Sequence, residues 1–275
     1  MDRIYKTVSI IGCGFLGYPL ALRLVQEGYN VYGTSTTPSK VAQLREDKVK
    51  AYVLKADERA ITTNAPQELW KSEVFVITLP PSRNFPRAAA NYPQRIKRIL
   101  EKIAVVAKAS LVIFTSSVSV YGNQNQELFE HTALKPQGIT AKACALAEQY
   151  LLSFSSSVCI LRLAGLIGGK RLAGRFLAGK KDVANGDMPV NLVRVEDVVN
   201  VIAKLIRRKT RSEIYNVCAD EHPRRAEFYP AVTRKLGLEE PTFLTETVGK
   251  YPARKVANQK IKMALNYTFI PLDYA

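Results

Sequence analysis

The chain has 275 residues, of which 47% are hydrophobic and 23% charged, enough for one large domain or for a domain with a smaller lobe. No apolar run approaches the roughly 20 residues of a membrane-spanning helix, the N-terminus lacks a signal peptide's apolar core, and no cysteine pair has metal-ligand spacing, so we expect a cytoplasmic protein with neither membrane partner nor metal. The formal net charge of +16 attracts anions, but the absence of a helix-turn-helix, zinc-finger or RNA-recognition motif argues against nucleic acid as a partner.

Short apolar runs alternate with segments of helical periodicity over the first 165 residues. Strand-like runs are expected at 7–12, 30–35, 49–54, 73–79, 110–117 and 158–165. Helical patterns lie between them at 16–27, 39–47, 92–108 and 139–154. Apolar strands that alternate with helices are typical of a parallel sheet covered on both faces. The pattern therefore predicts an α/β fold, with a Rossmann-type doubly wound parallel sheet in residues 1–165.

The character of the chain changes after residue 165. The stretch 166–190 is rich in glycine, lysine and arginine and has weak periodicity, which is typical of loops and short elements. Strand-like and helical patterns resume beyond it. We therefore expect a smaller, partly interleaved C-terminal substrate lobe at 166–275, from which the segment at about 191–219 returns to the Rossmann domain.

The strongest motif is GCGFLG, in which Gly12, Gly14 and Gly17 have the G-x-G-x-x-G spacing of a dinucleotide-binding turn. In such a turn the first glycine permits the tight bend, the second lets the backbone approach a pyrophosphate, and the third allows close packing of helix on strand. The N–H groups at the start of the following helix, here near Phe15, Leu16 and Gly17, then bind phosphate. A glycine turn without a ligand is the alternative.

The end of the second strand-like run indicates which dinucleotide is bound. An NAD site usually places Asp or Glu about 20 residues after the glycines, where it binds the ribose 2′-hydroxyl. No acidic residue occurs between Glu27 and Glu46, and this segment offers hydroxyls at Thr34 and Thr36, followed by Lys40. Hydroxyls and a cation bind a 2′-phosphate that a carboxylate would repel, so the sequence favours NADP over NAD. A solvated helix residue is the alternative for Lys40.

Four later segments carry a family resemblance: TSSVSVYG at 115–122, LRLAGLIG at 161–168, NLVRVEDVV at 191–199 and IYNVCA at 214–219. With the glycine loop, they resemble in type and order the extended short-chain dehydrogenases/reductases, which include NAD(P)-dependent sugar epimerases and dehydratases. The resemblance runs from about residue 7 to about residue 265. Within it, LRLAGL and the phrase GRFLAGK at 174–180 are similar to a bacterial branch, the YeeZ-type proteins.

The resemblance implies residues that surround the cofactor. Asp57, after the third strand, would lie near the adenine. Leu79 and Pro80, after the fourth strand, would line the cofactor. Thr115 and Ser116 would lie under its nicotinamide half.

The resemblance also implies catalytic residues. Ser117 stands at the position of the catalytic serine, and Lys142 near that of the lysine that binds the nicotinamide ribose and lowers the pKa of a nearby tyrosine. In the family's Y-x-x-x-K pattern both groups share one helix face. Four residues before Lys142 the chain has Gly138, and no tyrosine lies between Tyr121 and Tyr150. We therefore expect the usual acid/base to be absent.

Two other side chains are candidates for the proton donor. Tyr121 follows Ser117 closely in the sequence, and His131 precedes the Lys142 helix. The alternative for Tyr121 is a packed aromatic ring with a structural role, and the alternative for His131 is an ordinary surface histidine. Downstream, we expect Arg175 to bind an anionic substrate through its planar guanidinium, with a solvated basic loop as the alternative.

Two functions fit this pattern. The first is an NADP-dependent oxidoreductase or epimerase-like enzyme with non-standard catalytic residues, acting on an anionic small molecule of sugar- or nucleotide-linked type. The second is a non-catalytic NADP-binding sensor or scaffold, because the glycine loop is intact and the catalytic set is incomplete. Family members often dimerise through the helices at about 92–108 and 139–154, which makes a homodimer an alternative to a monomer.

Overall fold

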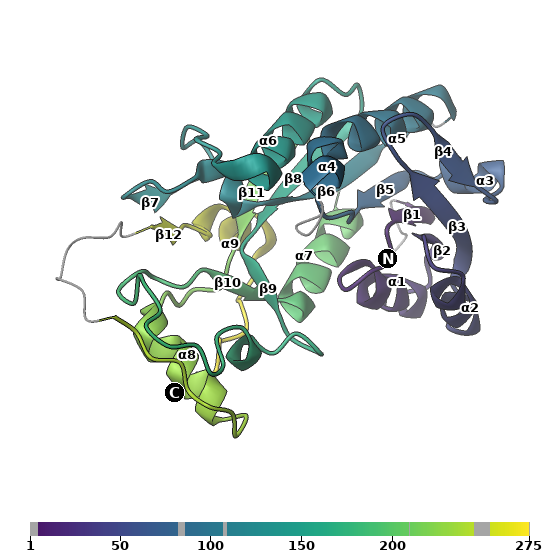
Figure 1. The fold of residues 1–275 in the computed structure, drawn as a ribbon. Coiled ribbons are helices and arrows are strands. Elements are labelled where there is room, and N and C mark those ends of the chain that lie inside the picture. Colours follow the sequence, from purple (N-terminus) through teal and green to yellow (C-terminus); the bar gives the residue numbers. More distant parts are fainter. Residues whose placement is uncertain (1–4, 82–85, 107–108, 209, 245–253, 275) are drawn as a thin grey trace. The chain divides into compact units, whose positions relative to one another are not determined.

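The computed structural model describes residues 5–81, 86–106, 109–208, 210–244 and 254–274 (Figure 1). The chain divides into two compact units. The first comprises Met1–Val120, Pro136–Arg162 and Val199–Ile214, and the second comprises Tyr121–Lys135, Leu163–Val198 and Tyr215–Ala275. Each unit is therefore built from segments that are far apart in the sequence.

The largest sheet has eight strands in the order β11-β8-β6-β5-β1-β2-β3-β4. In chain order these are β1 (Thr7–Ile11), β2 (Asn30–Ser35), β3 (Lys50–Ala56), β4 (Ile61–Thr63), β5 (Val74–Ile77), β6 (Leu111–Ser117), β8 (Ser157–Leu163) and β11 (Glu213–Val217). β1 pairs in parallel with both β2 and β5, and further parallel pairs join β2 to β3 and β5 to β6. β4 alone is shown to pair antiparallel, with β3. This order confirms the predicted Rossmann-type, doubly wound α/β sheet.

The central strands are buried on both faces, which explains their continuous apolar sequences. All four residues of β5 are buried, as are the first four of β6. Figure 1 shows α1 (Gly17–Gln26) and α2 (Pro38–Glu46) on one side of this sheet, and α5 (Tyr92–Val106) and α6 (Gly138–Leu152) on the other. Shorter helices are α3 (Gln67–Trp70) and α4 (Pro86–Ala90). Layers on both faces remove these strands from water.

The covering helices are amphipathic, as their sequence periodicity predicts. α1 buries Leu20 and Leu24, and α5 buries Ile96, Ile99 and Ile103 at three- and four-residue spacing. α7 (Val195–Arg207) begins with acidic residues and ends with basic ones, an arrangement that complements the helix dipole. No helix among the residues placed in the structure is long and apolar enough to cross a membrane.

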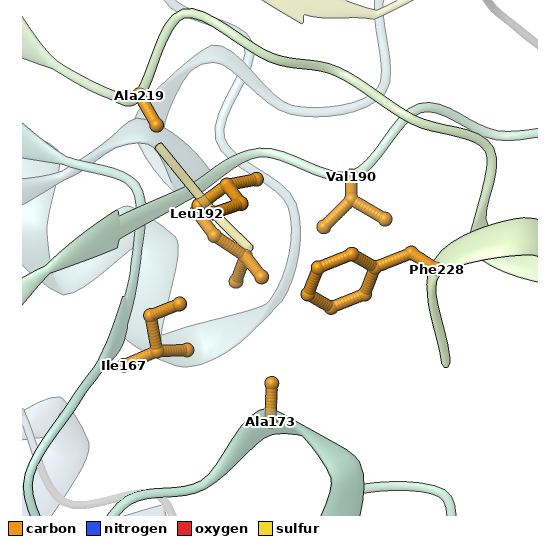
Figure 2. Packing of buried hydrophobic residues seen from close by; sticks show 7 residues of the cluster. Ile167, Ala173, Val190, Leu192, Ala219 and Phe228 are labelled. Atoms are coloured by element: carbon orange, nitrogen blue, oxygen red, sulfur yellow. The ribbon is translucent and has the colours of Figure 1, made fainter. Parts of the chain in front are cut away.

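The second unit has its own small apolar core. Its short strands pair as β9 (Gly165–Ile167) with β10 (Leu192–Arg194), and β7 (Glu127–Leu128) with β12 (Lys255–Val256). It also contains α8 (Arg225–Arg234) and α9 (Gln259–Leu265). Figure 2 shows the core at close range, and its buried members are Ile167, Ala173, Val190, Leu192, Ala219, Phe228 and Leu272. Phe228 has no exposed surface, so this aromatic ring anchors α8 to the unit.

Candidate functional site

The GCGFLG segment forms the turn between β1 and α1. β1 lies between β2 and β5, so this turn stands where the strand order reverses, at the carboxyl ends of parallel strands. Ligands of doubly wound sheets bind at this point. The φ angle of Gly12 is +105°, a conformation that favours glycine. A Cβ at Gly17 would collide with the carbonyl oxygen of Gly12, whereas a Cβ at Gly14 would meet no atom within 4 Å.

Two threonine hydroxyls bind the backbone of Gly12. The Gly12 N–H donates to Thr34 Oγ1 at 3.0 Å, and Thr78 Oγ1 donates to the Gly12 carbonyl oxygen at 2.6 Å. Thr34 is only 1% exposed, so its hydroxyl faces the turn and not the surface. Sequence reasoning did not single out Thr78. A hydroxyl directly after a buried strand that borders the glycine turn is the signal that would have found it.

The start of α1 suits an anion. α1 begins at Gly17, the preceding Leu16 makes no side-chain cap, and the first turn contains no acidic residue. Leu16 is buried, whereas Phe15 is 38% exposed at the tip of the turn. Because the N-terminus of a helix carries uncompensated N–H groups and a partial positive charge, this end favours a phosphate.

The end of β2 presents hydroxyls and one cation at the surface. Thr36 and Lys40 are exposed, and Lys40 has no hydrogen-bond or ion-pair partner within the described part of the chain. Ser35 is turned inward, and its Oγ accepts the Thr37 N–H at 3.2 Å. α2 begins directly afterwards at Pro38, again without an acidic residue in its first turn. The electrostatics of this edge are therefore favourable to a negative group.

Asp57 lies directly after β3 and is exposed. Its Oδ1 accepts the N–H groups of Ala60 at 2.8 Å and Arg59 at 2.7 Å, and these bonds hold the pKa of the carboxyl below its ordinary value. On the other side of the turn, Leu79 covers Gly12, since a Cβ at Gly12 would lie 2.7 Å from Leu79 Cδ2. The exposed Pro80 follows it.

At the end of β6, Ser116 is buried, whereas Thr115 and Ser117 are half-buried. Thr115 Oγ1 donates to the Ile77 carbonyl oxygen at 3.2 Å. Ser117 is half-buried, and its Oγ accepts the Ser119 N–H at 3.2 Å. Because that bond uses a lone pair and the Ser117 hydroxyl donates to no acceptor among the described residues, its proton is available for donation.

Lys142 lies in the first turns of α6 and is exposed. Over the residues that the structure describes, its ammonium has no hydrogen-bond or ion-pair partner. Gly138, four residues earlier, is the first residue of α6 and has a φ of +74°. A Cβ at Gly138 would meet no atom within 4 Å. Position 138, where the resemblance predicts the tyrosine of the Y-x-x-x-K pattern, therefore has room for a side chain.

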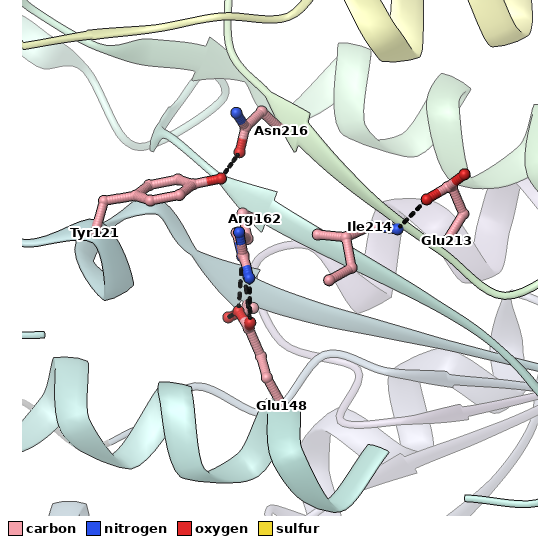
Figure 3. A network of polar contacts seen from close by, with 7 residues as sticks. Tyr121, Glu148, Arg162, Glu213, Ile214 and Asn216 are labelled. Atoms are coloured by element: carbon pink, nitrogen blue, oxygen red, sulfur yellow. Dashed lines mark hydrogen bonds and ion pairs between the residues drawn. The ribbon is translucent and has the colours of Figure 1, made fainter. Parts of the chain in front are cut away.

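A buried ion pair joins β8 to α6, and no local sequence pattern predicts it. Arg162 on β8 and Glu148 on α6 are 3% and 1% exposed. The Nη2 of Arg162 lies 2.8 Å from Glu148 Oε2, and its Nε lies 3.2 Å from both carboxylate oxygens (Figure 3). Ser116 Oγ donates to Glu148 Oε1 at 2.5 Å. Ser116 therefore joins β6 to this ion pair, and its hydroxyl faces the core.

Tyr121 belongs to the second unit and is fully buried. Its hydroxyl donates to Asn216 Oδ1 at 2.7 Å, as Figure 3 also shows. The backbone N–H of Asn216 donates to Glu130 Oε1 at 2.8 Å. His131 is exposed and stacks on Phe129, with ring centroids 5.5 Å apart. The phenol of Tyr121 thus has a structural partner.

Arg175 is exposed, and the residue before it is closely packed and hydrogen-bonded to α8. It ends a short 3₁₀ helix, Ala173–Arg175, in which a Cβ at Gly174 would collide with the Val232 carbonyl oxygen of α8. Thr233 Oγ1 donates to the Gly174 carbonyl oxygen at 2.9 Å. In the part of the chain that the structure describes, the Arg175 guanidinium has no partner, and it is therefore available to an anion.

The described residues indicate neither a metal site nor a reactive thiol. The described residues contain no group of three His, Cys, Asp or Glu side chains that could hold a metal ion. All four cysteines are buried free thiols. Burial raises the pKa of Cys13 and of Cys159 to about 12, so these thiols stay protonated and are poor nucleophiles.

Comparisons with known proteins bear on the family and the fold. A sequence model of the NAD dependent epimerase/dehydratase family matches residues 8–218. Protein YeeZ of Escherichia coli (strain K12) is 38% identical over 240 residues, with 86% of each chain covered. MoeE5, solved in complex with UDP-glucuronic acid and NAD, has a TM-score of 0.77 at 19% identity, with 96% of this chain and 94% of that chain covered.

A second solved structure gives the same result. UDP-glucuronic acid 4-epimerase from Bacillus cereus, in complex with UDP-glucuronic acid and NAD, has a TM-score of 0.75 at 17% identity, with 96% of this chain and 94% of that chain covered. Identities this low establish a shared fold alone. The family match over residues 8–218 and the 38% identity to YeeZ establish the family as well as the fold. The chain belongs to the NAD dependent epimerase/dehydratase family.

Proposed function

We propose that the turn between β1 and α1 binds the diphosphate of a nicotinamide dinucleotide. The observation that carries this proposal is the open space at Gly14, where a side chain would meet no protein atom within 4 Å. Gly12 and Gly17 are required by the fold itself, but no contact among the described residues requires a glycine at position 14. A ligand that approaches the backbone there supplies the reason.

We propose NADP as the preferred dinucleotide. The support is the exposed Thr36 and Lys40 at the end of β2, together with the absence of an acidic residue between Glu27 and Glu46. The hydroxyl of Thr34 does not contribute, because it binds Gly12. A 2′-phosphate at this edge would pair with the Lys40 ammonium and the first N–H groups of α2.

Reversing the charge of Lys40 tests this preference. In Lys40→Glu, we expect NADP affinity to fall by about tenfold or more while NAD affinity changes little, because only NADP carries the phosphate that the new carboxylate repels. Calorimetric titration of both dinucleotides measures the ratio. Lys71→Glu, an exposed lysine outside this edge, is the control with the same change in net charge. An unchanged ratio in Lys40→Glu would contradict the assignment of NADP.

The reaction that we propose is oxidoreductase or epimerase-like chemistry on an anionic, sugar- or nucleotide-linked substrate. A nicotinamide dinucleotide supplies hydride transfer when it is bound. Ser117 would donate its free hydroxyl proton to the reacting oxygen, and Lys142 would bind the nicotinamide ribose. Arg175 would bind the anionic group of the substrate through its planar guanidinium.

The catalytic set departs from the usual one at Gly138. With a glycine there, Ser117 and Lys142 are the polar groups that remain from the family pattern. General acid–base catalysis is commonly worth a factor of about 10² to 10⁴ in rate, so turnover would depend on another proton donor or on a reaction that needs none. The enclosed phenol of Tyr121 does not supply one, because it already donates to Asn216.

The glycine at position 138 also supports a second function, in which the chain is a non-catalytic NADP-binding protein that serves as a sensor or scaffold. The two functions separate in one experiment. Purified protein loaded with NADP is offered UDP-glucose and UDP-glucuronic acid, the ligands of MoeE5 in its solved complexes, and nicotinamide reduction and sugar products are followed. Turnover supports the enzyme. Tight cofactor binding without turnover, even with other anionic sugars, supports the sensor or scaffold.

A further inference from the structure

The two peptide groups that flank the Cα of Gly12 are both bound by threonine side chains. Thr34, near the end of β2, accepts the N–H on one side at 3.0 Å. Thr78, directly after β5, donates to the carbonyl oxygen on the other side at 2.6 Å. These bonds come from the two strands that border β1 in the sheet, and all the residues belong to the first unit.

We propose that Thr34 and Thr78 are positioning residues that fix the glycine turn in the conformation that a cofactor diphosphate requires. This inference rests on the proposed cofactor site at that turn. Neither threonine needs to touch the cofactor. Their role is to hold the backbone that does, and we call the pair the threonine clamp.

The first step of the argument concerns conformational freedom. A glycine with φ of +105° has many alternative conformations at little energetic cost, so its backbone must be held by its surroundings. Two bound peptide planes determine the φ and ψ angles between them. Thr34 also accepts the Cys13 N–H through its own carbonyl oxygen at 2.6 Å, and the Gly14 N–H bonds to the Gly12 carbonyl oxygen at 2.8 Å. The clamp therefore sets the path of the chain up to Gly14.

The second step concerns the position of α1. A Cβ at Gly17 would collide with the Gly12 carbonyl oxygen and would lie 2.8 Å from Thr78 Oγ1. The carbonyl oxygen that Thr78 binds is thus packed directly beneath the first residue of α1. By fixing that oxygen, Thr78 determines how closely the helix N-terminus, with its partial positive charge, approaches the turn.

The third step concerns chemistry that only a hydroxyl supplies. A valine at position 78 would place a methyl group about where the hydroxyl is, but a carbon and a carbonyl oxygen stay roughly 3.3 Å apart or more. The Gly12 carbonyl oxygen, now 2.6 Å from the hydroxyl, would lose that donor, keep only the Gly14 N–H, and be pushed away from position 78. A serine keeps the hydroxyl and removes only a methyl group, so serine should rescue what valine disrupts.

Calorimetric titration with NADP tests the clamp on Thr34→Val, Thr34→Ser, Thr78→Val and Thr78→Ser. We expect each valine variant to lose affinity by about tenfold, because a part-buried peptide group of Gly12 loses the hydroxyl that holds it, and each serine variant to stay close to wild type. The matched control is Thr63→Val. Thr63 Oγ1 also donates to a carbonyl oxygen and accepts an N–H, but on β4, and its loss should leave NADP affinity unchanged.

A second measurement does not depend on the cofactor. Because Thr34 accepts the Gly12 N–H, hydrogen exchange at that amide should be faster in Thr34→Val than in wild type and Thr34→Ser. Should a valine variant not fold, the corresponding alanine variant replaces it in the comparison with serine. Wild-type protein that binds neither NADP nor NAD overturns the proposed cofactor site. Wild-type protein that binds NADP, with valine variants that bind it equally well, overturns the clamp alone.

Discussion

Replacing Gly14 with valine should abolish dinucleotide binding while leaving the fold intact. A Cβ at this position would meet no protein atom within 4 Å, and the φ angle of Gly14 is not in the left-handed region, so the backbone tolerates a side chain. The isopropyl group would instead occupy the space through which a diphosphate reaches the backbone N–H groups. We expect NADP affinity to fall by at least about a hundredfold, measured by calorimetry.

Graded and contrasting variants separate this steric effect from a loss of structure. Gly14→Ala should lie between wild type and Gly14→Val in NADP affinity, with thermal stability close to wild type in both. Gly17→Ala should lose stability as well as binding, because its methyl group would collide with the Gly12 carbonyl oxygen. If Gly14→Val binds NADP as tightly as wild type, the cofactor does not lie on this turn.

Breaking the ion pair between Glu148 and Arg162 should give the largest loss of stability. Both side chains are almost fully buried, so removing one leaves the other charge without compensation in the interior. Such changes cost about 3–5 kcal/mol. We expect Glu148→Met and Arg162→Met each to lower the free energy of unfolding of the first unit by that amount, measured by urea denaturation followed through a probe in that unit.

The double variant carries the sharper test. Glu148→Met/Arg162→Met removes both charges and keeps apolar volume, so most of the lost stability should return. Recovery should be incomplete, because Ser116 then loses the acceptor for its hydroxyl, a cost of about 1–3 kcal/mol. Adding Ser116→Ala should restore that remainder. A double variant as unstable as the single ones would show that the pair is required for packing and not for charge compensation.

The sequence was informative where the physics is local. Hydrophobic periodicity located the strand at residues 30–35, which β2 reproduces, and the helix pattern at 39–47, close to α2 at Pro38–Glu46. The glycine spacing likewise located the turn between β1 and α1. In each case the residues that decide the structure lie within a few positions of one another.

What the sequence could not provide depends on contacts between distant segments. Successive strand residues face opposite sides, so the choice of hydroxyl that turns toward Gly12 is set by the register of β2 against β1. The sequence placed Thr34 and Thr36 in one group, whereas β2 ends at Ser35, so Thr34 lies buried within the strand and Thr36 lies exposed beyond it. Thr78 is 66 residues from Gly12, and no local pattern links them.

The left-handed backbone at Gly138 limits what a Gly138→Tyr substitution could achieve. Introducing a phenol there would require an L-residue at a φ of +74°, which costs roughly 1–2 kcal/mol before any catalytic benefit is gained. Avoiding that cost would require the first turn of α6 to leave its present conformation. Placing a phenol at position 138 would therefore require a different entry into that helix, and the single substitution Gly138→Tyr would not suffice.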